Sequence, residues 1–124
     1  MRSIDPFFDQ MERALDVMTR RQQLLASNVG NVDTPGYRTV DVDFNATLQE
    51  AVEQARRQDG GSVETSLRPV EIEGLATRPD GNNVNIDREM AELAATRHRY
   101  EVATNVLRNK LRQLRFAIME GRGA

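Results

Sequence analysis

The side chains most able to carry out acid–base chemistry, His98, Tyr100 and Glu101, lie in one segment with a helical pattern. Side chains at neighbouring positions on a helix point in different directions, so these three do not converge on one substrate. His98 is the only histidine, and a metal site built on it would need several carboxylates beside it. We therefore interpret His98 as a surface residue, and we predict no catalytic residue, no metal site and no cofactor.

A group of acidic residues suggests a divalent cation as an alternative. Asp41, Asp43 and Glu50 offer carboxylate oxygens, which are the ligands that Ca²⁺ and Mg²⁺ prefer. Their spacing matches no known metal-binding loop, and a solvated acidic stretch is the simpler interpretation. The chain has no cysteine, which excludes disulfides and thiolate metal sites.

Basic residues are concentrated in the C-terminal segment. Arginine side chains bind phosphate groups in a fork geometry, which suggests an alternative function: a basic amphipathic helical module that binds nucleic acid or an acidic membrane. The only aromatic residue interleaved with the arginines is Tyr100, and the formal net charge of the whole chain is −2. We favour acidic neighbours in a filament and predict no nucleic-acid partner. The basic residues, set against Glu101, are Arg97, Arg99, Arg108, Lys110, Arg112 and Arg115.

The size and composition of the chain allow one domain with a small core. The 124 residues are 39% hydrophobic and 5% aromatic, and the mean hydropathy is −0.60, values typical of long, half-exposed helices. No apolar run approaches the ~20 residues that span a bilayer. Residues 1–7 lack the apolar core of a cleaved signal peptide, so we expect any export to use a route that reads no such signal.

The first long helix is predicted to begin at Pro6, with Asp5 as its N-cap. Apolar residues then recur at spacings of three and four, with Gln22 as the one polar exception, until a segment rich in Asn, Gly and Pro ends the pattern. This is the spacing of a heptad-like seam. Its apolar members are Phe8, Met11, Leu15, Met18, Leu25 and Val29.

The second long helix is predicted over residues 87–119, with Asp87 as its N-cap and Gly121 closing it. At ~1.5 Å per residue it would be about 50 Å long, which indicates an elongated architecture. Its seam alternates spacings of three and four without a break. The members are Met90, Leu93, Arg97, Tyr100, Thr104, Leu107, Leu111, Leu114 and Ile118.

The segment between the two helices is polar and rich in turn residues. Alternating and turn-forming patterns predict only short pieces within it. These are an extended segment at 40–44, a helix over 46–57 with Leu48 and Val52 on one face, a flexible break at 59–62, an extended piece at 69–74 and a turn cluster at 78–83.

The first helix ends in residues suited to a sharp change of chain direction. Asn28 and Asn31 lie three apart on one helical face, where their amides can satisfy backbone groups of the last turn, which Gly30 weakens. Pro35 sets φ at the second position of a type II turn, and Gly36 supplies the positive φ of the third. The residues of this turn motif are Asn28, Asn31, Thr34, Pro35, Gly36 and Tyr37.

The turn motif resembles the signature of the axial proteins of the bacterial flagellum, a family of rod, hook and hook-associated subunits. In that family an Asn-rich helix end is followed by Thr-Pro-Gly-Tyr or Thr-Pro-Gly-Phe. Residues 80–90 also resemble the Asp-Gly-Asn-x-Val-Asp lead-in to the last helix of its proximal rod members. Two positions depart from the pattern, with Asn85 in place of Asp and Gly30 in place of Ala. A generic amphipathic module would explain the apolar stripes but not both motifs.

The resemblance implies a structural subunit of the proximal rod in the flagellar basal body. It implies export through the flagellar type III apparatus with no cleaved signal peptide, and no transmembrane segment. The implied partners are copies of the chain, other rod proteins, the export gate and the adaptor proteins between membrane ring and rod. The sequence has no large central insertion, which separates it from the distal rod and hook subunits.

We therefore expect one mainly α domain, in which long N- and C-terminal helices pack as a coiled-coil-like hairpin beside a polar, partly irregular middle segment. Its parts are residues 1–37, 38–85 and 86–124. The apolar stripes are too thin to complete a core alone, so neighbouring subunits would have to cover them. The expected assembly seam comprises Met11, Leu15, Met18, Leu25, Met90, Leu93, Tyr100, Leu107, Leu111, Leu114 and Ile118.

Overall fold

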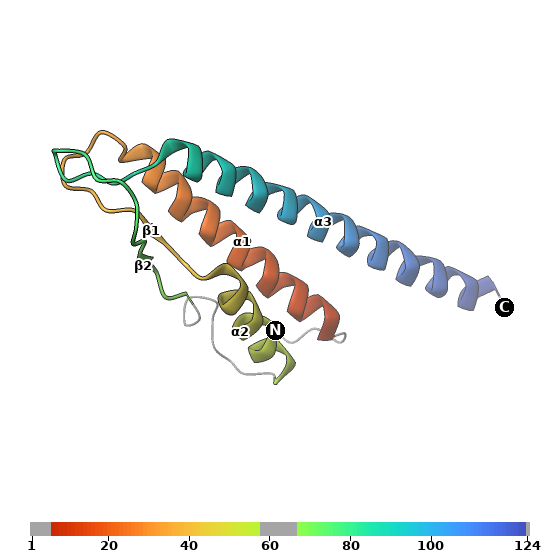
Figure 1. Cartoon of the computed structure of the whole chain (residues 1–124). Coiled ribbons are helices and arrows are strands. Elements are labelled where there is room, and N and C mark those ends of the chain that lie inside the picture. Colours follow the sequence, from red (N-terminus) through yellow and green to blue (C-terminus); the bar gives the residue numbers. More distant parts are fainter. Residues whose placement is uncertain (1–5, 58–66, 124) are drawn as a thin grey trace.

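The computed structural model describes residues 6–57 and 67–123 of the chain. The two long helices, α1 and α3, run antiparallel, and α2 packs on α1, so that α1 lies in the middle; the start of α2, at Phe44, also touches α3 (Figure 1). The predicted mainly α fold with long helices at both ends is confirmed. The elements are α1 (Pro6–Gly30), β1 (Val40–Asp41), α2 (Phe44–Arg56), β2 (Val70–Glu71) and α3 (Ile86–Gly123).

The bounds of α1 follow from its terminal residues. Pro6 is the first helical residue, as predicted, and at this position its missing N–H costs no hydrogen bond. The predicted cap, Asp5, lies outside the described residues. At the other end, the N–H of Asn31 still bonds to the Ser27 carbonyl at 3.1 Å, and the chain then leaves the helix.

A small apolar core lies between α1 and α2. Val17 and Met18 of α1 form it with Phe44 and Ala51 of α2, and Leu48 packs against the cluster. All four core residues are at most 8% exposed. Burial of such side chains stabilises a fold by about 1.5–3 kcal/mol each for the larger ones, so this cluster holds α2 on α1.

The helix α2 begins two residues before the predicted start at 46, because Asp43 caps it. The Asp43 carboxylate accepts a hydrogen bond from the Ala46 N–H at 3.2 Å, and the Thr47 hydroxyl donates to the Asp43 carbonyl at 2.7 Å. Phe44 was therefore wrongly predicted as extended. It is the first residue of the helix, and the favourable cap outweighs its place in the alternating pattern.

The extended segments on either side of α2 pair as two short antiparallel strands. Val40 of β1 lies opposite Glu71 of β2, and Asp41 lies opposite Val70. The extended pieces predicted at 40–44 and 69–74 are thus confirmed as strands at residues 40–41 and 70–71. The flexible break predicted at 59–62 lies outside the described residues.

The helix α3 starts earlier and ends later than predicted. Asn85, not Asp87, is its N-cap: the Asn85 side chain accepts from the Arg88 N–H at 3.1 Å. Asp87 is the second residue of the helix, where a carboxylate favours the positive end of the helix dipole. Gly121 does not close the helix, which continues to Gly123 and reaches about 57 Å at ~1.5 Å per residue.

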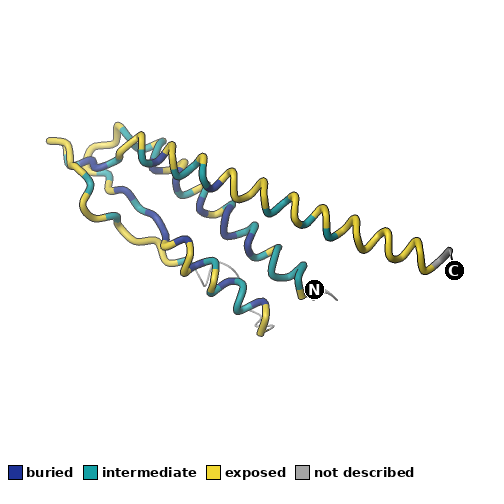
Figure 2. The backbone as a smooth tube through the Cα atoms, turned by 45° about the vertical axis from the view of Figure 1, so that its right-hand side comes forward, coloured by how far each residue is buried: buried dark blue, intermediate teal, exposed yellow. Residues whose placement is uncertain are grey.

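The last part of α3 has no tertiary cover from the described residues. Lys110 lies over the ring of Phe7, the second residue of α1, at 5.6 Å. From Leu111 onward α3 runs past the end of α1, and every residue from 111 to 121 is exposed (Figure 2). We call residues 111–121 the α3 overhang.

Candidate functional site

Seven polar side chains fill the interface between α1, β1 and the first turns of α3. Most are nearly excluded from solvent, and together they occupy the place that an apolar seam would take in a coiled coil. Because buried polar groups are costly unless hydrogen-bonded, this arrangement depends on mutual satisfaction. The members of this buried polar cluster are Arg21, Asn28, Asp41, Arg88, Glu89, Glu92 and Thr96.

Arg21 joins all three elements through its guanidinium group. Its Nε and Nη2 donate to the two carboxylate oxygens of Asp41 at 3.1 and 3.0 Å. Nη2 also donates to Glu92 at 2.8 Å, and Nη1 donates to the Thr96 hydroxyl at 3.2 Å. Such two-point arginine–carboxylate contacts are the strongest of protein ion pairs, so Arg21 holds α1, β1 and α3 in one relative position.

Asp41 is shared between two arginines and is 1% exposed. Arg88 of α3 donates to Asp41 Oδ2 at 2.8 Å, and the Val42 N–H donates to Oδ1 at 2.7 Å. Burial by itself raises the pKa of Asp41, but the hydrogen bonds from Arg21, Arg88 and Val42 outweigh it and hold the pKa below its ordinary value of 3.8. The carboxylate is thus ionised at neutral pH.

The same contacts keep the Arg21 guanidinium group positively charged. Burial lowers its pKa, but the hydrogen bonds and charges of Asp41 and Glu92 raise it above the ordinary value. Glu89, which is fully buried, accepts from Arg88 at 2.6 Å. Each charged group in the cluster therefore has an oppositely charged partner, and none offers a vacant acid or base for catalysis.

Asn28 connects the cluster to the backbone of β1. Its Nδ2 donates to the Val40 carbonyl at 2.7 Å and to Glu89 at 3.0 Å. Its Oδ1 accepts from the Tyr37 hydroxyl at 2.8 Å and from the Val40 N–H at 3.3 Å. Asn28 therefore satisfies the backbone of the neighbouring strand, whereas the sequence predicted contacts within its own helix end.

Asn31 makes the contacts within the helix end that were predicted. Its Nδ2 donates to the Ser27 carbonyl at 2.8 Å, and its Oδ1 accepts from the Thr34 hydroxyl at 3.0 Å. The buried Asn82, which comes from the turn before α3, donates to the Asn31 and Thr34 carbonyls at 2.9 and 2.8 Å. Residues that sequence analysis placed in two separate motifs thus lie in one hydrogen-bonded unit.

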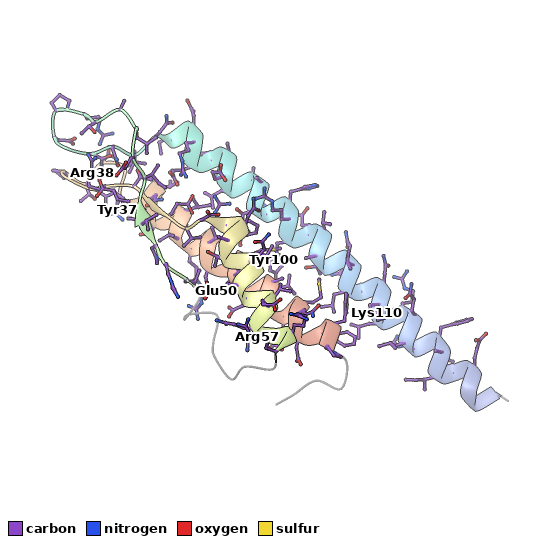
Figure 3. All side chains as sticks on the ribbon, turned by 60° about the horizontal axis from the view of Figure 1, so that its bottom comes forward. Tyr37, Arg38, Glu50, Arg57, Tyr100 and Lys110 are labelled. Atoms are coloured by element: carbon purple, nitrogen blue, oxygen red, sulfur yellow. The ribbon has the colours of Figure 1, made fainter. Side chains whose placement is uncertain are left out.

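This unit, residues 34–37 together with 80–83, is named the tip clasp. The Gly36 N–H donates to the Asp80 carbonyl at 2.8 Å, and the Asn83 N–H donates to the Tyr37 carbonyl at 3.2 Å. Tyr37 and Arg38, labelled in Figure 3, lie where the two loops meet. The clasp fixes the angle at which the chain leaves α1 and enters α3.

Two glycines allow the loops of the tip clasp to meet. Gly36 has φ +75°, the positive value predicted from the sequence, and Gly81 has φ +88°. A Cβ atom on Gly81 would lie 3.3 Å from the Cα of Gly36, so the two backbones meet at a distance that leaves little room for a side chain. Both the conformation and the close approach therefore favour glycine at position 81.

The residues of the expected assembly seam occupy very different environments. Met18 and Leu25 are buried, and Met11, Leu15, Leu93 and Leu107 are half-buried. The exposed members are Met90, Tyr100, Leu111, Leu114 and Ile118. Within one chain the seam residues of α1 are therefore buried or half-buried, whereas most of those of α3 are exposed.

The buried face of α3 is offset by one residue from the apolar pattern near its start. Glu89 and Thr96 point into the interface and are fully buried, whereas Met90 is 53% exposed and the Arg97 side chain is 78% exposed. The signal for this face is a polar one: Glu89, Glu92 and Thr96 recur at helical spacing, as Arg21 and Asn28 do in α1. The predicted seam follows the apolar spacing from Met90, with Arg97 and Thr104 as its polar members, and so does not contain this face.

The residues considered for chemistry lie apart from one another. His98 is exposed, and Glu101 pairs with Arg97 at 3.5 Å. Asp41 belongs to the buried polar cluster, and Asp43 caps α2. Among the described residues no three His, Cys, Asp or Glu side chains are placed to hold a metal ion. In the same residues no helix combines the length and the hydropathy needed to cross a bilayer.

Known proteins of similar sequence identify the family of this chain. No family model matches the chain. The flagellar basal body rod protein FlgB of Yersinia enterocolitica is 30% identical over 126 residues, with 89% of this chain and 91% of that protein covered. FlgB of Salmonella typhimurium is 29% identical over 125 residues, with coverage of 89% and 91%. FlgB of Borrelia hermsii is 29% identical over 126 residues, with coverage of 89% and 93%. Nearly the whole chain is thus similar to nearly the whole of each relative. The chain belongs to the FlgB family of flagellar basal body rod proteins.

Proposed function

We propose that this structural subunit of the flagellar rod assembles through the α3 overhang, which packs against neighbouring rod subunits. The observation that carries the proposal is the exposure of large apolar side chains along residues 111–121. They are between 37% and 65% exposed, on a helix with no tertiary cover from the described residues. These side chains are Leu111, Leu114, Phe116, Ile118 and Met119.

The apolar side chains of the overhang are distributed around the helix. Leu111, Leu114 and Ile118 form one stripe at spacings of three and four, and Phe116 points to the opposite side. A helix that is apolar on more than one side is typical of one that is surrounded by other elements. Full burial of such a side chain contributes about 1.5–3 kcal/mol, and because these three are between 37% and 60% exposed, covering the rest would contribute roughly half of that each, which favours assembly.

The remaining parts of the molecule would then position the overhang. The buried polar cluster and the tip clasp hold α1 and α3 at a set angle, so each subunit presents its overhang in the same direction. A surface at one end of a molecule that binds a different surface of the next one forms a chain or helix of subunits. We propose that residues 1–37, 38–85 and 86–124 act as one domain in this assembly.

The partners in this proposal are copies of the chain, other rod proteins, the export gate and the adaptor proteins between membrane ring and rod. Export through the flagellar type III apparatus without a cleaved signal belongs to the same proposal. Membership of the FlgB family supports the association with rod components. The cysteine-free sequence is compatible with passage through a narrow channel in an unfolded form.

Replacing Leu111 with Glu tests the role of the overhang. Leu111 is 51% exposed, so the substitution should leave the fold of the isolated chain unchanged while placing a charge in the buried contact. In cells that lack the native copy, we expect the variant to be exported while rods and swimming are lost. The control is Gln113→Glu, which adds the same charge two residues away on a polar, exposed position. Normal swimming by the Leu111→Glu strain would overturn the proposal.

A further inference from the structure

Three arginines form a line along the end of α3. Arg108, Arg112 and Arg115 are spaced by four and three residues, so their side chains share one face of the helix. Two other arginines of α3 have acidic partners: Arg88 pairs with Asp41 at 2.8 Å, and Arg97 pairs with Glu101 at 3.5 Å. No carboxylate in residues 6–57 and 67–121 pairs with any of the three. We call them the arginine stripe.

The arginine stripe lies directly beside the apolar stripe of the same helix. Leu111 is three residues after Arg108 and four before Arg115, which places it at the edge of both stripes. The surface thus consists of leucine and isoleucine side chains bordered on one side by positive charge. A helix with apolar residues bordered by carboxylates would complement it in both respects.

The outer face of α1 has that composition in its first three turns. Phe8, Glu12 and Leu15 follow one another at spacings of four and three; Glu12 is exposed, and the two apolar residues are half-buried. No cation among the described residues pairs with Glu12. Asp16, one turn further along, has only a loose contact with Arg20 at 3.8 Å, in which both side chains are nearly half exposed.

The two complementary surfaces are not in contact within one molecule. Lys110 lies over Phe7, at the start of α1, so the overhang continues away from α1 (Figure 3). The thirteen residue steps from Lys110 to Gly123 carry the helix about 20 Å further at ~1.5 Å per residue. A contact between the arginine stripe and the outer face of α1 therefore joins two molecules.

We propose that the α3 overhang of one copy docks along the outer face of α1 of a second copy, with the arginine stripe facing Glu12 and Asp16. The inference rests on the proposed function and adds the identity of one partner and the charges that select it. The contact joins two different surfaces, so each copy keeps one of each for the next, and the contact repeats along the assembly. Because part of the attraction is between exposed charges, added salt weakens it.

Because the contact joins two different surfaces, its charges can be tested by reversing them on one surface at a time and then mixing the two variants. The variant Arg112→Glu/Arg115→Glu places acidic residues opposite Glu12 and Asp16, and Glu12→Lys/Asp16→Lys places basic residues opposite the arginines. Each variant alone then repels itself. In a mixture, the overhang of each variant meets a complementary face on the other, so both contacts are restored.

Sedimentation velocity of the purified full chain provides the measurement, with circular dichroism to confirm that the variants keep their helix content. We expect the native chain to self-associate at low salt, each variant alone to do so roughly tenfold or more weakly, and the mixture to recover. The control is Asn109→Glu/Gln113→Glu, which adds two negative charges to the same turns on another face and should associate like the native chain.

The outcomes separate this inference from the proposed function. A native chain that stays monomeric, or a mixture that does not recover, would overturn docking on a second copy. If the arginine variant nevertheless abolished rods and swimming in cells, the overhang would bind a different rod protein and the proposed function would stand. Normal swimming by both the arginine variant and the Leu111→Glu variant would overturn both.

Discussion

Arg21 and Asp41 meet in a two-point ion pair with distances of 3.1 and 3.0 Å, in an interface where the exposed fractions of the two residues are 5% and 1%. Arg21 comes from the middle of the first helix and Asp41 from the strand after the turn. Arg88 and Glu92 add the start of the last helix to the same network. A polar contact thus takes the central position in a helical hairpin whose sequence predicts an apolar seam.

Replacing Arg21 with Met should destabilise the folded chain by about 3 kcal/mol. The substitution keeps the apolar stem but leaves Asp41 and Glu92 without their shared cation, and loss of one partner of a buried ion pair typically costs ~3–5 kcal/mol. Urea unfolding followed by circular dichroism measures the change. Arg97→Met is the matched control, because the Arg97 side chain is 78% exposed and pairs with Glu101 one helical turn away at 3.5 Å, so it should cost less than ~1 kcal/mol. Equal effects of the two variants would contradict the structural role of the cluster.

The lowered pKa of Asp41 predicts a loss of stability in acid. A carboxylate with a pKa lower in the folded than in the unfolded chain stabilises the fold above the unfolded pKa, near 3.8, and this contribution disappears as pH falls through the folded value. We therefore expect the difference in unfolding free energy between the native chain and Asp41→Asn to be largest near neutral pH. It should shrink as the pH falls below about 4. A difference that stays constant from pH 7 to pH 3 would show that Asp41 does not act through its charge.

The tip clasp predicts a specific requirement for glycine at position 81. Gly81→Ala would place a Cβ atom 3.3 Å from the Gly36 Cα in a backbone with φ +88°, so we expect a loss of about 1–2 kcal/mol. At Gly36, which has φ +75° but open space around it, Val should destabilise through backbone strain alone. Gly30→Ala is the control, because Gly30 ends a helix and has no atom within 4 Å of an added Cβ. It should be neutral or slightly stabilising, and a comparable loss at all three positions in thermal unfolding would argue against the clasp.

The parts of the fold that follow from a local pattern of residues could be predicted from the sequence. The parts that depend on contacts between residues far apart in the chain could not. Spacings of three and four placed both long helices, and the type II turn chemistry at Pro35 and Gly36 predicted the positive φ that Gly36 has. The N-cap of α3 was predicted at Asp87, with Glu89 and Glu92 in or near the first turn, where the helix dipole favours acidic residues. Asn85 is preferred in the structure because its side chain reaches the Arg88 N–H.

The buried polar cluster shows why the orientation of α3 could not be read from apolar spacing. Glu89 and Thr96 are buried because Arg21 and Asn28 lie opposite them, and a carboxylate so paired can occupy an interface that would reject it alone. Rotating the helix to bury Met90 would leave these charges without partners. The preference therefore depends on residues more than sixty positions away in the sequence, which no local pattern contains.

Hydrogen exchange should divide α3 into two parts at about Lys110. Amides near Thr96 lie in turns that pack on α1 and belong to the buried polar cluster, so they should open only with the global unfolding of the chain. Amides of the α3 overhang have no tertiary contact with the described residues, and an isolated helical end of this length is marginal in water, so they should exchange many times faster. Conditions that promote assembly should then slow exchange in the overhang alone, because neighbouring subunits cover it. Exchange followed by mass spectrometry of peptic fragments measures both rates. Equal protection along the whole of α3 in the isolated chain would mean that the overhang is already covered within one molecule, and the assembly surface would have to lie elsewhere.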